Sequence, residues 1–478
     1  MGSTCGPIDV TELTISAFHA ALLNETTTCA AVVHAYLDRI ARYDNTLRSL
    51  ICVNEDALRT ATIKDEETRT LIKKNKPLPS LHGVPVILKD NFTTADLPTS
   101  AGVKALQKLR TTEDSEVVSR LREAGAIILA KANLHEFALH GTTTSSLGGQ
   151  TLNPYDLTRT PGGSSGGTGA ALAANLGLVG CGTDTVNSLR SPASACSIVG
   201  FRPSLGRVSG QGIVPVTDMQ DTAGPMGRTL RIGILDAFFG LEDPKSDQSE
   251  ELIAENALVQ RVVHEAIASI EDGSDINLIH IDPASHADWR YATLRANADT
   301  QDFEFRERLD TFLQSPFISY TPHQSLKSIA ESGEYDKTAV TETFTASLED
   351  PDTFSLESKA YRARLDGVQA HKMSVQDCFD KNEIDALLYP HQRQLAAPVG
   401  TTVQPRRNGV LAALAGTPAI CIPAGFSPPT SSAAQGVPIG LELMGPAGND
   451  EELLDLAERI EGILQRRKAP NMNEMDGP

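Results

Sequence analysis

The stretch GGSSGGTGAALAANLGLVGCGTDTVNSLR, residues 162–190, decides how the fold of this chain is interpreted. It is rich in Gly, Ser, Thr and Ala, and its charged side chains are Asp184 and Arg190. Such a composition is typical of a flexible linker, but the apolar run at 170–180 is compatible with a helix. We therefore interpret residues 141–227 as a compact core, in which the glycine-rich backbone closely approaches other parts of the protein.

Short apolar runs before this region indicate a sheet. Residues 84–88 (VPVIL) and 126–130 (AIILA) predict buried strands, and polar Lys89 follows the first of them directly. Apolar side chains at helical spacing predict helices at 29–42 and 115–124. Helices that alternate with fully apolar strands are typical of an α/β fold, so we expect a large mixed β-sheet covered by helices on both faces.

The second half of the chain has a polar part and an apolar part. Residues 236–382 are more polar and irregular, and we interpret them as a mostly helical cap. Three strand-like apolar runs and a closing amphipathic helix follow, at residues 386–390, 411–426, 437–445 and 450–465. We expect one domain over residues 1–478, whose core is formed by about residues 75–230 and 383–465.

Charge and cysteine usage restrict the classes of function. The 478 residues include 42 Lys+Arg and 61 Asp+Glu, and the net charge of -19 repels nucleic acid and anionic membranes. No apolar stretch has membrane-spanning length. Seven scattered cysteines without a CxxC pair, and an N-terminus without a signal-peptide pattern, favour free thiols in a reducing compartment. We expect a cytoplasmic protein that binds neither nucleic acid nor membrane.

The loop GGSSGG at residues 162–167 allows three interpretations. It is not a phosphate-binding loop, because such a loop needs Lys and then Ser/Thr after its last glycine, and here Thr168, Gly169 and Ala170 follow. Gly163-x-Ser165-x-Gly167 matches the G-x-S-x-G elbow of some hydrolases, but that turn follows an apolar strand, whereas residues 153–161 are polar and turn-prone. A Gly/Ser surface loop explains this segment, taken alone, about as well as any other interpretation.

A second serine favours a functional interpretation of this loop over a surface loop. Residues 182–190 (GTDTVNSLR) form a stretch crowded with turn residues, which can direct several backbone N–H groups at one point, as in an oxyanion hole. Lys89 at a strand end, the serine pair of the glycine-rich loop, and Ser188 in a turn are each weak signals. Together they indicate a hydrolase that uses a serine nucleophile and a lysine base.

Three segments resemble the signature blocks of the amidase signature family, at residues 83–91 (GVPVILKDN), 162–167 (GGSSGG) and 182–190 (GTDTVNSLR). Ser164 and Ser188 lie 24 residues apart, which is the family's spacing between its bridging and nucleophilic serines. The likeness covers roughly residues 10–230 and 383–465. It implies a single amidase-signature domain that hydrolyses a carboxamide without a metal or cofactor.

The resemblance also implies a role for individual residues. Ser188 would be the nucleophile that forms an acyl-enzyme, Ser164 the proton bridge and Lys89 the base, which burial must keep uncharged. The implied oxyanion hole consists of the backbone N–H groups of Thr185, Val186, Asn187 and Ser188. Ser165, Asp184 and Arg190 would support this turn through hydrogen bonds. A cis peptide bond is implied between Gly163 and Ser164.

Two departures from the family pattern bear on activity. The family usually has Gly-Gly before the nucleophile, whereas this chain has Val186-Asn187. A β-branched Val tolerates a positive φ badly, so the oxyanion hole persists only if Val186 has an ordinary backbone conformation. In that case we expect its side chain to narrow the acyl pocket. Family members also usually have a core-packing helix and a loop before the RIGIL-type strand. Here Thr229 and Leu230 run directly into residues 231–235 (RIGIL), so we expect that helix to be missing from this chain.

Three functions therefore compete. The first is a stand-alone amidase for a small-molecule amide, with a homodimer as one conceivable assembly. The second is the amidase component of a tRNA-dependent amidotransferase complex, against which the acidity of the chain and the changed turn weigh. The third is a catalytically inactive, amidase-like binding protein.

Three histidines are further candidates for the site. His135 and His140 are five residues apart, so they diverge on a helix and do not fit the i, i+4 zinc motif. We interpret the segment around them as the polar N-terminal surface of a helix. His391 could line the substrate cavity, although an ordinary hydrogen-bonded histidine explains it better.

Overall fold

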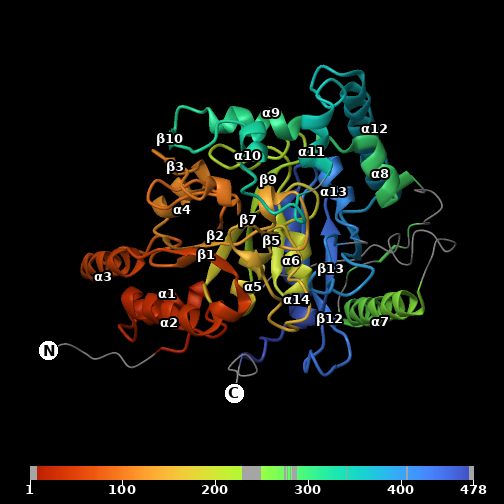
Figure 1. Cartoon of the computed structure of the whole chain (residues 1–478). Helices are drawn as coiled ribbons and strands as arrows, with labels where there is room; N and C mark the ends of the chain where they lie inside the picture. The colour runs from red at the N-terminus through yellow and green to blue at the C-terminus, as the bar shows by residue number, and fades with distance from the viewer. Residues whose placement is uncertain are drawn as a thin grey trace.

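A nine-stranded sheet runs through the centre of the computed structural model (Figure 1). The structure describes residues 8–228, 249–273, 276, 278–279, 281, 288–340, 342–404 and 407–472. In spatial order the sheet contains β1 (Leu50–Val53), β4 (Ile127–Ala132), β2 (Pro85–Lys89), β7 (Val179–Asp184), β9 (Thr222–Gly227), β8 (Val199–Arg202), β12 (Ala419–Phe426), β13 (Pro438–Met444) and β11 (Leu387–Pro390). Two small two-stranded sheets complete the strands, β3 (Arg110–Thr111) with β10 (Ile318–Tyr320) and β5 (Thr144–Ser145) with β6 (Gly149–Gln150).

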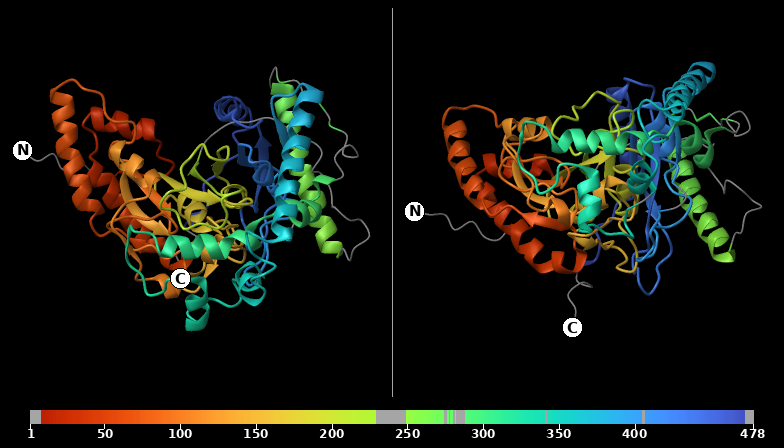
Figure 2. Two further views of the ribbon diagram at one scale, coloured as in Figure 1. Left: turned by 90° about the horizontal axis from the view of Figure 1, so that it is seen from above. Right: turned by 45° about the horizontal axis from the view of Figure 1, so that its top comes forward.

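Helices pack around this sheet. They are α1 (Ile15–Leu23), α2 (Cys29–Leu47), α3 (Ala57–Lys73), α4 (Glu116–Glu123), α5 (Gly166–Ala173), α6 (Arg190–Ala195), α7 (Glu250–Gly273), α8 (Tyr291–Ala298), α9 (Gln301–Leu313), α10 (Leu326–Ser332), α11 (Glu342–Glu349), α12 (Lys359–Asn382), α13 (Val410–Ala415) and α14 (Asp450–Leu464). Helices α6 and α7 lie on opposite sides of the C-terminal strands (Figure 2). The predicted α/β fold with a mixed, helix-covered sheet is confirmed. No helix in the described ranges is long and apolar enough to cross a membrane.

The direction of the strands brings residues of the candidate site together. β2 runs parallel to both β4 and β7, with Leu88 opposite Cys181, while the remaining pairs in the sheet are antiparallel. Parallel neighbours bring their carboxyl ends to the same edge of a sheet. Lys89, the last residue of β2, therefore lies next to Thr183 and Asp184 at the end of β7.

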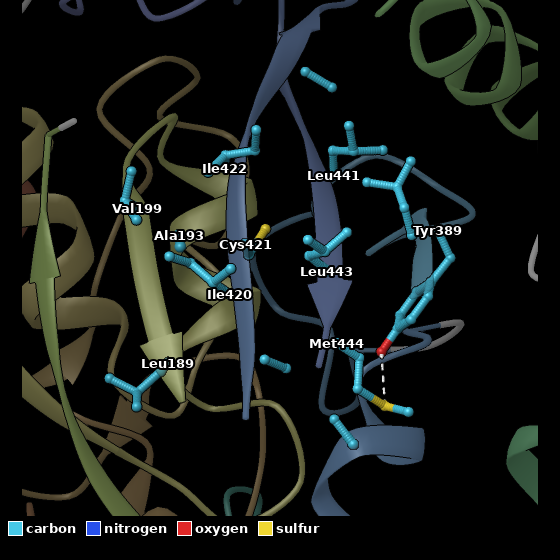
Figure 3. Close-up of a cluster of buried hydrophobic side chains, with 14 of the residues drawn as sticks. Leu189, Ala193, Val199, Tyr389, Ile420, Cys421, Ile422, Leu441, Leu443 and Met444 are labelled. Atoms are coloured by element: carbon cyan, nitrogen blue, oxygen red, sulfur yellow. Dashed lines mark hydrogen bonds between the residues drawn. The ribbon is translucent and has the colours of Figure 1, made fainter. Parts of the chain in front are cut away.

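The C-terminal half of the sheet contains a large apolar core. Leu189 and Ala193 from the α6 region pack near Val199, Ile420 and other buried side chains of β8, β12 and β13 (Figure 3). Leu189 directly follows the predicted nucleophile, so the core anchors that turn by burying its neighbour.

The glycine-rich region is packed rather than linker-like. A Cβ on Gly167 would lie 2.1 Å from the carbonyl oxygen of Asn133, and one on Gly163 would lie 2.7 Å from Thr143 Oγ1. No side chain fits at such distances, so glycine is required where these backbones meet. The interpretation of this region as a compact core is confirmed.

Most predicted elements are present, with two corrections. Residues 170–180 do not form one helix, because α5 ends at Ala173 and β7 begins at Val179. The run 411–426 is also not strand throughout, because its first residues form α13 and β12 begins at Ala419. Both stretches are apolar on all sides, and such runs do not distinguish a buried helix from a buried strand. The junction at residues 229–235 lies outside the described residues.

The helices of the predicted cap occupy two places. α7 packs against β12 and β13 together with α14. Helices α8 to α12 lie along the top in Figure 1, where α9 joins the cluster formed by Leu106, Phe137 and Phe344. The division of the chain into a core and a cap remains a prediction.

Candidate active site

The amine of Lys89 is completely buried at the end of β2. Its Nζ lies 2.7 Å from Ser164 Oγ and 2.7 Å from Thr183 Oγ1. Burial lowers the pKa of Lys89 to about 7, although the negative charges of Asp184 and Asp221 act in the opposite direction. Both contacts of the amine are hydroxyl groups, so an uncharged lysine can take up a proton from either of them.

Ser164 and Ser165 lie in the loop that leads into α5, after a cis peptide bond between Gly163 and Ser164. The Ser165 hydroxyl donates to the carbonyl of Thr183 over 3.1 Å and accepts from Thr183 N over 3.3 Å. A Cβ on Gly182 would lie 2.6 Å from this hydroxyl, so a glycine is needed there. Ser165 thus fixes the loop to β7, and Ser164 remains directed at Lys89.

The turn from Thr185 to Ser188 has its carbonyl groups directed into the protein. In chain order they accept hydrogen bonds from Gln220 Nε2 (3.4 Å), Arg190 Nη2 (2.7 Å), Ser191 N (2.7 Å) and Ser165 N (3.2 Å). The N–H groups of the same four residues donate to no acceptor within the described ranges. The predicted oxyanion hole requires a turn whose carbonyls are engaged and whose N–H groups are available, and its role here remains a prediction.

Val186 and Asn187 do not strain this turn. Neither is among the described residues with a positive φ. The Val186 side chain is half-buried and packs against the large apolar core. The condition under which the predicted oxyanion hole persists, an ordinary conformation at Val186, is therefore met.

Ser188 is almost completely buried, with 6% of its surface exposed. Its carbonyl oxygen is held by Ser165, but no hydrogen bond connects its hydroxyl to Ser164 in the part of the chain that the structure describes. The structure thus brings Lys89 and Ser164 into direct contact, and places Ser188 beside Ser165 with its hydroxyl not bonded to the proposed bridge.

A buried ionic network lies behind the turn. Arg190 donates from Nε and Nη2 to the Asp184 carboxylate over 3.1 and 3.0 Å, and Arg202 Nη1 lies 2.9 Å from the same group. Burial alone would raise the pKa of Asp184, but the two guanidinium groups hold it well below its usual value. Arg190 also pairs with Glu442 on β13. These contacts connect the turn with β8 and β13, and the supporting role expected for Asp184 and Arg190 remains a prediction.

Of the three candidate histidines, His135 and His391 are fully buried and His140 is half-buried. His391 is fully buried, and its Nδ1 contacts the Glu442 carboxylate, while its Nε2 has no partner among the described residues. The interpretation of residues around His135 as polar surface is wrong: His135 and Glu136 are completely buried, and His135 contacts the Ala339 carbonyl over 2.7 Å. Tertiary contacts with the segment near Ala339 cover a stretch whose sequence is polar. Within the described parts of the chain, no group of three or more His, Cys, Asp or Glu side chains could hold a metal ion.

Sequence reasoning missed two residues of this site. Thr183 contacts the lysine amine, and it could have been found because it precedes Asp184 on a strand parallel to β2. Asp221 accepts a hydrogen bond from Thr185 Oγ1 over 2.7 Å, and burial raises its pKa to about 6. No local pattern connects Asp221 with the turn, since the two are 36 residues apart.

Comparisons with known proteins identify relatives of this chain. The profile of the family described as Amidase matches residues 31–257. A probable amidase of Arabidopsis thaliana is 30% identical over 501 aligned residues, which cover 96% of this chain and 92% of the plant protein. One of the chains of the glutamyl-tRNA(Gln) amidotransferase of Acidothermus cellulolyticus is 29% identical, with 91% of each chain covered.

Solved structures extend the similarity to three dimensions. The native peptide amidase of Stenotrophomonas maltophilia superposes with a TM-score of 0.79 and 28% identity, covering 96% of this chain and 98% of that chain. The fold, the buried lysine–serine pair and these relatives lead to one conclusion. The chain belongs to the amidase signature family and is an amidase, an enzyme that hydrolyses the carbon–nitrogen bond of amides.

Proposed function

We propose that the chain hydrolyses a carboxamide through an acyl-enzyme on Ser188, with Ser164 relaying protons to a neutral Lys89. Ser188 Oγ attacks the amide carbonyl while its proton passes to Ser164, whose own proton passes to Lys89 Nζ. The tetrahedral intermediate then collapses, the C–N bond breaks, and the proton returns through Ser164 to the leaving nitrogen. Water repeats the cycle on the ester, releasing the acid and free Ser188.

The 2.7 Å contact between Lys89 Nζ and Ser164 Oγ carries this proposal. A lysine in water is protonated at neutral pH and cannot accept a proton. Here burial brings its pKa to about 7, so a large fraction is uncharged under ordinary conditions. The contact distance is short enough for a proton to pass in either direction.

The turn at residues 185–188 supports the proposed tetrahedral intermediate on Ser188. Its N–H groups donate to no acceptor in the described parts of the chain, so they can bind the negative oxygen of the tetrahedral intermediate. The carbonyls of the same residues are tied to four different partners, which fixes the direction of those N–H groups before substrate arrives. Preorganised donors of this kind typically contribute about 10²–10³-fold each to the rate.

A fluorophosphonate probe tests the nucleophile. We expect it to label the wild-type protein covalently, and labelling to be lost in Ser188→Ala. Ser191→Ala is the matched control, because Ser191 lies on adjoining α6 and its hydroxyl has no hydrogen-bond partner in the described ranges. Absence of labelling in the wild type would instead favour an amidase-like binding protein.

The relatives named as chains of a glutamyl-tRNA(Gln) amidotransferase favour a second candidate function. Those relatives work in a complex, so tagged protein isolated from its own cells should then bring down stoichiometric partner chains. We propose the stand-alone amidase, which predicts purification without partners and activity on free amides. A homodimer and a cytoplasmic location remain part of this proposal, the latter because most of the described cysteines are free and buried.

Substrate choice is the next question for this function. A panel of short aliphatic, aryl and peptidyl amides, scored by ammonia release, would identify the preferred acyl group. Because Val186 belongs to the turn of the predicted oxyanion hole, we expect its side chain to narrow the acyl pocket, so that small or linear acyl groups are preferred over bulky ones. Val186→Gly should widen the range of amides accepted.

A further inference from the structure

Thr143 has an unusual backbone conformation beside the glycine-rich loop. The residue is completely buried, and its φ is 56°. Among the described residues other than glycine that have a positive φ, only Thr143 has a β-branched side chain. Such a residue rarely adopts this conformation, which costs free energy and persists only where surrounding contacts impose it. The Thr143 carbonyl accepts a hydrogen bond from Thr151 N over 3.0 Å, so neighbouring backbone holds it in place.

The hydroxyl of Thr143 connects the two ends of the loop that carries Ser164. It donates to the Gly162 carbonyl over 2.7 Å and accepts from Gly166 N over 3.1 Å. In the described ranges neither loop group has another hydrogen-bond partner. Gly166 begins α5, and the first N–H groups of a helix have no partner within it. The N-cap residue Ser165 makes no side-chain capping bond, so Thr143 supplies this contact from another segment.

The loop packs directly against this hydroxyl. A Cβ on Gly163 would lie 2.7 Å from Thr143 Oγ1, and a Cβ on Gly166 would overlap the same atom. Glycine at both positions therefore lets the hydroxyl reach between the two ends of the loop. Packing at this density leaves the loop little freedom to move while Thr143 stays in place.

Ser164 itself is bound by the same segment of the chain. His135 N donates to the Ser164 carbonyl over 3.0 Å. Backbone groups before, at and after Ser164 thus bind to residues 135–143, which fixes the loop along its length. The Ser164 hydroxyl, held by this backbone, lies 2.7 Å from Lys89 Nζ.

We propose that Thr143 is a positioning residue for the proton relay, and that it places Ser164 Oγ at the distance from Lys89 that proton transfer requires. The inference rests on the function proposed above and adds to it a residue that acts through the loop backbone. An ordinary negative φ would turn the Thr143 side chain in a different direction. The unfavourable conformation is therefore the one that brings the hydroxyl between Gly162 and Gly166.

A positioning role and a purely structural role predict different kinetics. Proton transfer requires heavy-atom separations of about 2.6–3.2 Å. A displacement of the Ser164 hydroxyl by about 1 Å would lower the rate by up to roughly 100-fold and leave binding of the amide unchanged. A purely structural role would lower the free energy of unfolding and leave the rate of the folded protein as it is.

Steady-state kinetics of Thr143→Val and Thr143→Ser test the proposal on a panel amide that the wild-type protein hydrolyses. Valine keeps the shape and removes the hydroxyl, so kcat per folded protein should fall about 10–100-fold while KM stays nearly unchanged. Serine keeps the hydroxyl and should retain most of kcat. The relay acts in acylation and in deacylation, so kcat responds whichever step limits the rate.

Thr151→Val is the matched control. Thr151 is also completely buried, and its hydroxyl donates to the Arg48 carbonyl over 2.7 Å and accepts from Asn133 Nδ2 over 3.0 Å. The variant loses the same number of hydrogen bonds as Thr143→Val, but both partners lie outside the glycine-rich loop. It should lower the free energy of unfolding to a similar extent and leave kcat close to that of the wild type.

Equal kcat in Thr143→Val and Thr151→Val, measured per folded protein, overturns the positioning role. A loss in Thr143→Ser as large as in Thr143→Val, or an effect confined to KM, overturns it as well. If Thr143→Val does not fold, Thr143→Gly answers the question. Glycine adopts a positive φ readily and lacks the hydroxyl, so the same loss of kcat is expected.

Ser164→Ala separates this inference from the proposed function. It should lower kcat more than any Thr143 variant, and an undiminished kcat would remove both Ser164 and the role of Thr143 from the mechanism. Failure of the wild type to cleave any amide in the panel would instead overturn the proposed function, and this inference with it.

Discussion

Two buried lysines on neighbouring strands of this protein have opposite surroundings. Lys89 ends β2 and Lys131 lies on β4, and both side chains are completely buried. Leu88 is opposite Lys131 in the parallel ladder, so the two lysines project from opposite faces of the sheet. Lys131 Nζ lies 2.9 Å from Asp90 Oδ1, whereas Lys89 contacts two hydroxyl groups.

The difference in surroundings is the one expected between a structural cation and the base of the proposed mechanism. A carboxylate in direct contact stabilises the charged ammonium, which then serves as one half of an ion pair. Without that contact, burial penalises the charge and leaves an amine that accepts protons near neutral pH. On the proposed mechanism, the same residue type on adjacent strands has two different functions, and the four predictions below test this in order of expected size.

Removal of the base should have the largest effect on activity. Lys89→Met keeps the volume of the side chain and deletes its amine, so the rate of acylation should fall about 10²–10⁴-fold. The free energy of unfolding should stay equal or increase, because the side chain removed is one whose charge burial disfavours. Stopped-flow acylation and denaturant unfolding check both. A variant that retained most of the activity would remove Lys89 from the mechanism.

The structural lysine should respond in the opposite way. Lys131→Met leaves the Asp90 carboxylate buried without its cation, and should lower the free energy of unfolding by about 3–5 kcal/mol. The folded fraction that remains should keep much of the wild-type rate. The double variant with Asp90→Asn should recover stability, and an unchanged unfolding midpoint in the single variant would contradict the ion-pair interpretation.

Activity should depend on pH through Lys89. Its pKa of about 7 means that the amine is protonated and inactive as a base below this pH. The acylation rate should therefore rise as pH increases through 7, with a slope of about tenfold per pH unit on the acid side. A pH profile of kcat/KM measures this. A flat profile between pH 5 and 8 would contradict a base with this pKa, and a rise that continues past pH 9 without a plateau would indicate a lysine with its ordinary pKa of about 10.4.

The smallest expected effect is a shift of the pH profile when Asp221 is replaced. Its negative charge raises the pKa of Lys89, against the lowering by burial. Asp221→Asn removes that charge, so the acid limb of the profile should move to lower pH by a fraction of a unit. Asp218→Asn is the matched control, since that exposed carboxylate pairs with Arg308 and should leave the limb in place. Movement of the acid limb to higher pH would contradict the expected effect of Asp221 on the pKa of Lys89.

Local patterns in the sequence were sufficient to predict the main elements. Short apolar runs identified β2 and β4, and Ser115 was expected at the start of α4, where its hydroxyl indeed accepts from Val118 N. Patterns failed where a stretch is apolar on every side, as at residues 170–180, and where distant segments bury polar residues, as at His135. In those places burial by other parts of the chain decides the structure.

The sequence by itself determined the family, the mixed α/β fold and the three residues proposed for catalysis. It could do so because each of these three residues lies in a short motif that is continuous along the chain. Tertiary structure alone decided which buried lysine lacks a carboxylate, that Thr183 and Asp221 approach the site, and that Val186 has an ordinary backbone conformation. The physical reason is that a charge state depends on neighbours in space. Those neighbours come from strands and loops that are far apart along the chain.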